Sequence, residues 1–151
     1  MIRGQQGAAY VETLIAFPPT LFLFLAIFQY MEIAAADLVV RRAAHAAVRA
    51  AVVVYSDSAA YYDGTPPQGR KPYVDEAARR TLLAAPEIDY RSVSIAVSGQ
   101  LAGNAEITVD LSVPYRCSVF WARFVCGFDS RIQLGSRSSL PFLGSRLAAG
   151  G

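Results

Sequence analysis

The sequence predicts an α+β protein in which a long N-terminal helix packs on a small antiparallel sheet, together with a second, short helix. Three observations support this fold class. An apolar run near the N-terminus continues without a turn signal into an alanine-rich amphipathic segment, and helical periodicity over such a length indicates one extended helix. A shorter helical pattern follows later in the chain. Three further segments alternate between apolar and polar residues, which is typical of strands with one buried face.

The composition of the chain limits its size class and its chemistry. At 151 residues, the chain has room for one domain and an anchor but not for two independent cores. The net charge is +2 and the basic residues are scattered, which does not indicate a nucleic-acid partner. Two cysteines and one histidine are too few for a Cys/His zinc site. We therefore expect no metal and no other cofactor.

The first element is a helix that we expect to extend from Ala8 to Tyr55, over roughly 70 Å. Its apolar part, Leu14–Ile33, is long enough to cross about 30 Å of hydrocarbon and too long for the apolar region of a secretory signal. Pro18 and Pro19 lie inside this part. Because each proline lacks an N–H and crowds a carbonyl one turn back, we expect a kink or a locally unwound segment. It is either a tolerated irregularity of a transmembrane helix or a functional hinge.

The second half of this helix is amphipathic. Its polar residues share one arc of the helix surface: Asp37, Arg41, Arg42, His45 and Arg49. Small apolar residues occupy the opposite side: Ala36, Val40, Ala43, Ala47, Ala50 and Val54. This small-residue face allows close approach of a sheet of the same chain or of a neighbouring helix. Asp37 and Arg41 are four positions apart and predict an ion pair.

The head begins with a loop and a short helix. Ser56–Lys71 is rich in Gly, Pro and Tyr, which predicts a loop. Pro72 then opens a helix over about Tyr73–Ala85. Acidic and basic residues four apart in this helix predict two ion pairs: Asp75 with Arg79, and Glu76 with Arg80.

Three segments predict the strands of the head: Ser92–Ser98, Glu106–Val113 and Ile132–Leu140. Gln100–Asn104 is the expected hairpin turn between the first two. Alternate residues place apolar side chains on one face of the sheet: Val93, Ile95, Val97, Ile107, Val109, Leu111 and Val113. Ser and Thr take the other face, as in an antiparallel sheet with one wet side. We expect the long helix and the short helix to cover the apolar face.

Cys117 and Cys126 enclose a short segment that contains Phe120, Trp121 and Phe124. If the head lies outside the cytoplasm, a disulfide between the two cysteines is expected; the alternative is two free buried thiols. A loop of this size stabilises the fold by roughly 2–3 kcal/mol in the loop-entropy model. The three aromatic side chains form either a contact patch for another subunit or the buried side of a loop packed against the sheet.

A short polar leader precedes the apolar run. Arg3 is its one basic residue, Gly7 ends it, and Glu12 lies five positions later. This arrangement resembles the class III signal of type IV pilins, which a membrane aspartyl protease cleaves after the glycine. The resemblance implies cleavage between Gly7 and Ala8, so that Glu12 becomes the fifth residue of the mature chain. It also implies that Glu12 pairs with the new α-amino group of an adjacent subunit and sets the axial register. The alternative is an interfacial glutamate whose carboxylate faces water.

The resemblance is more specific to the TadE-like minor pilins (pseudopilins) of the tight-adherence (Tad) type IV pilus system. The pattern R-G-x-x-G-A-A-x-V-E, the apolar run with proline near its start, the strand Ile107–Tyr115 and the Ser-rich segment Ile132–Leu140 carry it. Thr13 departs from the major Tad pilins, which have an aromatic residue after the glutamate. The chain is also longer than those short pilins, which favours a minor pilin.

This resemblance implies three parts: a leader over 1–7, a membrane-spanning and assembly helix over 8–55, and an α+β head over 56–151. It implies a single span of the bacterial inner membrane, a periplasmic head, incorporation into an extracellular pilus, and a role in pilus assembly, adhesion or secretion. The partners it implies are other pilin subunits, Tad assembly proteins, the prepilin peptidase and the lipid bilayer, without nucleic acid. The alternative is an unprocessed single-pass scaffold protein of the pilus or secretion machinery.

No sequence pattern indicates an enzyme. His45 lies among arginines without a nucleophile, base or metal partner nearby in the sequence, so we expect a solvated helix residue. Asp75 and Glu76 are adjacent and do not face each other across a site, as general acid and base groups would. We expect no catalytic residues and no metal ligands.

Overall fold

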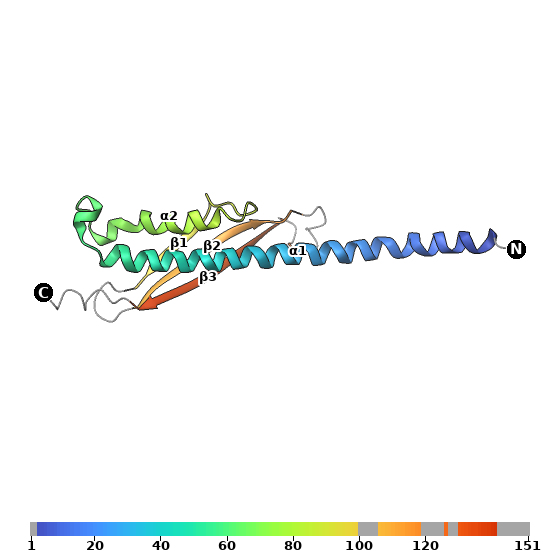
Figure 1. Ribbon diagram of the computed structural model, residues 1–151, viewed down its shortest axis with the longest axis horizontal. Helices are drawn as coiled ribbons and strands as arrows, with labels where there is room; N and C mark the ends of the chain where they lie inside the picture. The colour runs from blue at the N-terminus through green and yellow to red at the C-terminus, as the bar shows by residue number, and fades with distance from the viewer. Residues whose placement is uncertain (1–2, 100–105, 119–125, 127–129, 142–151) are drawn as a thin grey trace.

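The computed structural model describes residues 3–99, 106–118, 126 and 130–141. In these residues the elements are α1 (Arg3–Ser56), the short 3-10 helices η1 (Ala59–Tyr62) and η2 (Pro67–Arg70), α2 (Lys71–Leu82), β1 (Ser94–Ser98), β2 (Glu106–Arg116) and β3 (Arg131–Pro141). The strands form one antiparallel sheet in the order β1-β2-β3. The predicted α+β class, with its long N-terminal helix, short second helix and antiparallel sheet, is confirmed (Figure 1).

The helix α1 is continuous over 54 residues. It begins at Arg3 rather than at Ala8, so the polar leader is part of the same helix. Figure 1 shows its N-terminal half projecting beyond the sheet and its C-terminal half lying along the head. α1 remains helical through Pro18 and Pro19, so of the two expected alternatives, a kink or a locally unwound segment, the unwound segment is wrong. Prolines are tolerated inside membrane-spanning helices where nearby groups and small local adjustments satisfy the freed backbone groups.

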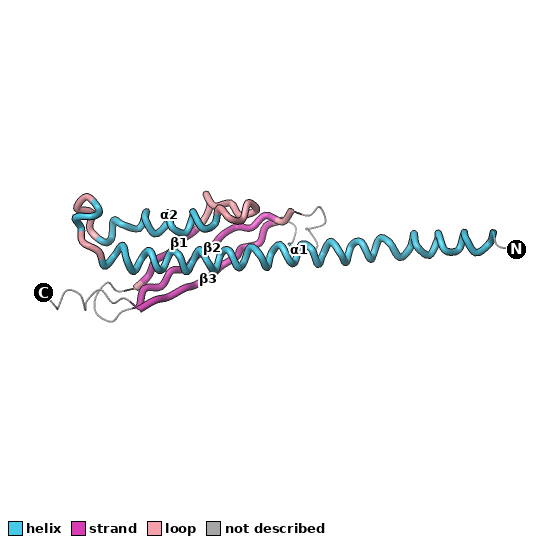
Figure 2. The backbone as a smooth tube through the Cα atoms, in the orientation of Figure 1, coloured by secondary structure: helices cyan, strands magenta, loops and turns pink. Residues whose placement is uncertain are grey.

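The C-terminal half of α1 forms the centre of the core. It contacts β2, β3 and α2, and α2 runs alongside it (Figure 2). The predicted small-residue face is buried except at Ala50, which is half-buried, and Ala44, Val48 and Ala51 are buried as well. The buried arc is wider than predicted because two neighbours, the sheet and α2, cover α1 from different sides.

The central strand β2 supplies the sheet's share of the core. Its alternate residues Ile107, Val109, Leu111, Val113 and Tyr115 are buried, as the period of two requires. β2 continues to Arg116, past the predicted end at Val113. Pro114 is tolerated because its missing N–H lies on the β1 side, where pairing has already ended at Ser112. On that side the next donor, Arg116 N, bonds the Glu87 carbonyl oxygen at 3.2 Å.

The other strands also differ slightly from their predicted bounds. β1 begins at Ser94 rather than Ser92 because Ser92 closes a turn, its N–H donating to the Asp89 carbonyl oxygen at 3.2 Å. β3 exceeds its predicted segment by one residue at each end. The expected hairpin turn at Gln100–Asn104 lies outside the described residues.

The second helix, α2, occupies Lys71–Leu82 instead of Tyr73–Ala85. The ion pairs of Glu76 with Arg80 and, in α1, of Asp37 with Arg41 are confirmed. The predicted pair of Asp75 with Arg79 is wrong. Asp75 bonds Lys71 one turn earlier at 2.9 Å, because the helix begins early enough to include that lysine. Arg79 instead donates to the Tyr90 carbonyl oxygen at 3.3 Å.

The loop predicted over Ser56–Lys71 is folded around one arginine. Arg70 is only 1% exposed, and its guanidinium donates to three backbone carbonyl oxygens: Val54 at 2.7 Å, Thr65 at 2.8 Å and Asp57 at 2.9 Å. It also lies 4.5 Å from the centre of the Tyr62 ring. Because Val54 O and Asp57 O are at the end of α1, the cation complements the negative end of the helix dipole.

Candidate functional site

The N-terminal half of α1 is an apolar helix that the rest of the described chain leaves uncovered. Large apolar side chains from Tyr10 to Phe28 are exposed except for the half-buried Leu25, and Tyr30 and Met31 are exposed as well. Leu14 is 76% exposed and Phe17 is 61% exposed. The most apolar window of Tyr10–Ser56 has a mean hydropathy of 2.0, and none of that window is buried. Among the described residues this is the one helix long and apolar enough to cross a membrane. Such a surface is unfavourable in water, so it needs lipid or other helices as cover.

The expected cleavage site lies in the first turns of α1. Gly7 and Ala8 are both helical. A Cβ added at Gly7 would meet no atom within 4 Å, so the fold of this chain supplies no reason for a glycine there. Glycine destabilises a helix by about 1 kcal/mol relative to alanine. Near a helix end, that weakness makes local unwinding easier.

Glu12 lies near the start of the exposed apolar segment. It lines a shallow groove on one side of α1 together with Thr13, Ala16, Phe17 and Thr20. Thr20 Oγ1 donates to the Ala16 carbonyl oxygen at 2.8 Å. Among the described residues, Glu12 takes part in none of the ion pairs. A carboxylate at the edge of a hydrocarbon layer is costly unless it is paired or hydrated, so its partner comes from water, lipid headgroups or another chain.

Two hydrogen bonds join α1 to the head where the exposed segment ends. Gln29 Nε2 donates to the Tyr115 hydroxyl oxygen at 3.4 Å, and Ser118 Oγ donates to a Glu32 carboxylate oxygen at 2.5 Å. Burial raises the pKa of Tyr115, and the nearby Glu32 carboxylate raises it further. The phenol therefore stays protonated at neutral pH. Gln29 and Glu32 are about one turn apart, so the two bonds fix one face of α1 against the end of β2.

The predicted disulfide is confirmed at the same place. Cys117 and Cys126 are bonded, with their Cα atoms 6.7 Å apart, and both are buried. Because Cys117 precedes Ser118, the cross-link holds the segment that contacts Glu32. Phe120, Trp121 and Phe124, which the sequence suggested as subunit contacts, lie outside the described residues.

His45 has a partner that the sequence did not indicate. His45 is exposed, as expected of a solvated helix residue, but its Nδ1 lies 2.8 Å from Ser138 Oγ, so the expectation that it has no partner is wrong. Ser138 is only 5% exposed, because it sits on the face of β3 that packs against α1. The pair fastens α1 to β3. In the described part of the chain, no group of three or more His, Cys, Asp or Glu residues is placed to hold a metal ion.

Sequence reasoning missed the residues that join the helix to the head. Gln29 and Glu32 are polar residues inside the apolar run Leu14–Ile33. A polar residue in such a run generally has a partner inside the protein, and this signal was available. The partners of Gln29 and Glu32 could not be predicted, because Tyr115 lies 86 positions from Gln29, and Ser118 lies 86 positions from Glu32.

The fold and this junction define a class: an α+β head carried by a single N-terminal helix that is suited to spanning a membrane. Comparison with family models, curated proteins and solved structures finds no match for this chain.

Proposed function

We propose that this chain is a TadE-like minor pilin of a Tad-type pilus. In this proposal α1 anchors it in the bacterial inner membrane with the head in the periplasm, and a prepilin peptidase cleaves it after Gly7. The observation that carries the proposal is the division of α1 into an uncovered apolar half and a half that forms the spine of the head. The mature chain would then join a pilus, or prime its assembly, and so support adhesion or secretion.

The length of the uncovered half supports this placement. From Tyr10 to Phe28 the helix rises about 27 Å, close to the roughly 30 Å thickness of a bilayer's hydrocarbon core. Gln29, whose side chain donates a hydrogen bond to the Tyr115 hydroxyl of the head, follows directly. The polar groups that fix the head therefore begin where the hydrocarbon ends.

The position of Glu12 supports an assembly role. Ala8, the N-terminal residue after cleavage, lies one helical turn before Glu12, about 6 Å along the axis. A neighbouring subunit displaced along the filament axis would bring its new α-amino group to this carboxylate. Pairing would remove the cost of an uncompensated charge in an apolar setting and would define the axial step between subunits.

The competing function is an unprocessed single-pass scaffold protein of the same machinery. The intact mass of the full chain, measured after co-expression with a prepilin peptidase, separates the two. The pilin proposal expects loss of residues 1–7. Gly7→Ala is expected to abolish this loss without harming the fold, because no atom lies near the added methyl. Gly4→Ala, the same change within the leader, is the matched control and should be processed normally. An uncleaved wild-type chain would reject the pilin proposal in favour of the scaffold.

A further inference from the structure

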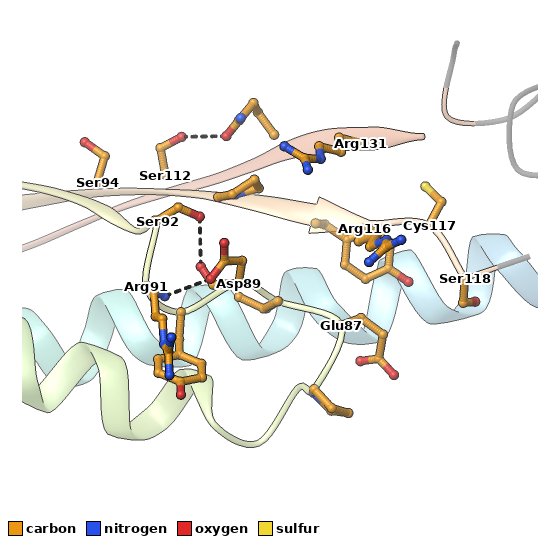
Figure 3. Close-up of a pocket in the computed structure, with 16 residues that line it drawn as sticks. Glu87, Asp89, Arg91, Ser92, Ser94, Ser112, Arg116, Cys117, Ser118 and Arg131 are labelled. Atoms are coloured by element: carbon orange, nitrogen blue, oxygen red, sulfur yellow. Dashed lines mark hydrogen bonds between the residues drawn. The ribbon is translucent and has the colours of Figure 1, made fainter. Parts of the chain in front are cut away.

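A cavity of about 1190 Å³ in the head lies next to the junction between α1 and the sheet. It is bounded by the segment that follows α2, including Glu87, Asp89 and Arg91, and by the adjoining ends of β2 and β3 (Figure 3). Ser118, which bonds Glu32 of α1, also lines it. The cavity is therefore at the end of the head from which the uncovered half of α1 projects.

The level of this cavity relative to a bilayer follows from the helix. Glu32 lies four residues beyond Phe28, a rise of about 6 Å past the end of the roughly 27 Å segment Tyr10–Phe28. The headgroup layer on each side of the hydrocarbon is roughly 5–8 Å thick. When α1 spans the membrane, Glu32 and Ser118 lie in the headgroup layer, and the cavity opens beside them.

Two arginines occupy opposite positions on neighbouring strands at the end of the sheet that borders this cavity. Arg116 and Arg131 are direct cross-strand partners of β2 and β3, and both are exposed and line the cavity. Like charges placed directly opposite destabilise a sheet. Neither arginine belongs to an ion pair among the described residues. An anion between the two guanidinium groups would remove the repulsion.

The remaining charges of the cavity leave this pair uncompensated. Arg91 adds a third guanidinium, while Glu87 and Asp89 supply two carboxylates. Asp89 accepts a hydrogen bond from the backbone N–H of Arg91 at 3.1 Å. Hydrogen bonds from Ser92 and Arg91 hold the pKa of Asp89 below its usual value. The Asp89 carboxylate is therefore engaged by hydrogen bonds within its own turn. Neither Glu87 nor Asp89 forms an ion pair with an arginine in the described part of the chain.

We propose that the cavity at the end of β2 and β3 binds the phosphate of an anionic phospholipid in the bilayer that α1 spans. Guanidinium groups are suited to phosphate because their donors match its oxygens, and basic residues near an anionic membrane surface gain about 1 kcal/mol each. The inference rests on the membrane insertion contained in the proposed function, but not on cleavage after Gly7. Binding would hold the head against the membrane surface in a fixed orientation.

Native mass spectrometry of the full chain released from lipid nanodiscs tests this inference. The discs contain equal amounts of phosphatidylglycerol and phosphatidylcholine, and the measured quantity is the ratio of the two lipids retained by the chain. The double variant Arg116→Gln/Arg131→Gln should lower phosphatidylglycerol retention roughly thirtyfold, from the loss of two basic residues at the surface. Arg116→Lys/Arg131→Lys keeps both charges and should retain most of the preference.

The matched control is Arg42→Gln/Arg49→Gln. Both side chains are exposed on α1, about 21 and 31 Å beyond Phe28 along the helix, and this variant should behave as the wild type.

Equal retention of the two lipids by the wild type would overturn the inference, as would unchanged retention in the Gln double variant. Failure of the chain to enter any disc would also overturn it, and with it the membrane placement in the proposed function. Binding of inorganic phosphate in detergent without a preference for phosphatidylglycerol in discs would reject the lipid as the source of the phosphate. Normal lipid preference in a chain that the peptidase leaves intact would reject only the pilin assignment.

Discussion

Replacing Arg70 tests whether one buried cation holds the far end of the head together. Arg70→Met keeps most of the side-chain volume but removes the donors to the carbonyl oxygens of Val54, Asp57 and Thr65. Hydrogen bonds from a charged group contribute about 1.5–3 kcal/mol each. Of the three, only the bond to Val54 is fully buried, so water can replace part of the other two. We therefore expect a loss of about 3 kcal/mol in the free energy of unfolding, dominated by the carbonyl left without a donor.

Thermal unfolding of the full chain in detergent, followed by near-ultraviolet circular dichroism, measures this loss. That signal reports tertiary packing of the head rather than the helicity of the membrane segment. A loss of about 3 kcal/mol should lower Tm by roughly 6–12 °C in a domain of this size. Arg70→Lys keeps the charge but not the planar fork, and its Tm should fall between those of the wild type and Arg70→Met.

Arg49→Met provides the matched control, because Arg49 is exposed on the same helix and surface substitutions usually change stability by less than about 0.5 kcal/mol. The reasoning is refuted if Arg70→Met melts within 2 °C of this control. In that case the loop between α1 and α2 would fold without the guanidinium.

Two further predictions concern the membrane half and the junction. Glu12→Ala should still permit membrane insertion and cleavage but impair incorporation into filaments, as scored by immunoblotting of sheared pili; normal piliation would remove the register role of Glu12. Burial raises the pKa of Tyr115 above its ordinary value of 10.0, so its contribution to stability is complete below pH 10 and is lost as the pH rises through the folded-state pKa. Tyr115→Phe should make the melting temperature less sensitive to pH above 10, and an unchanged alkaline slope would contradict this.

The elements that sequence reasoning placed correctly are those with strong periodicity. The length of α1 followed from a continuous helical pattern, and the strands followed from alternation such as that of Ile107, Val109 and Leu111. These patterns report which side of an element is apolar, and that property is local. Element ends were less predictable. β2 passed through Pro114 because its neighbour on that side had already ended, and α2 began early enough for Lys71 to pair with Asp75.

The apolar N-terminal half of α1, the short polar segment with Gly7, and the position of Glu12 could all be read from the sequence alone. Hydrophobicity and spacing along one helix do not depend on the rest of the fold. The polar contacts that hold the molecule together were decided only by the tertiary structure. Ser138 lies 93 residues from its partner His45, and Arg70 reaches back 16 residues to the end of α1. Such pairs form only when packing of the core brings distant segments within hydrogen-bonding distance, and a buried polar group is stable there only if its partner is in place.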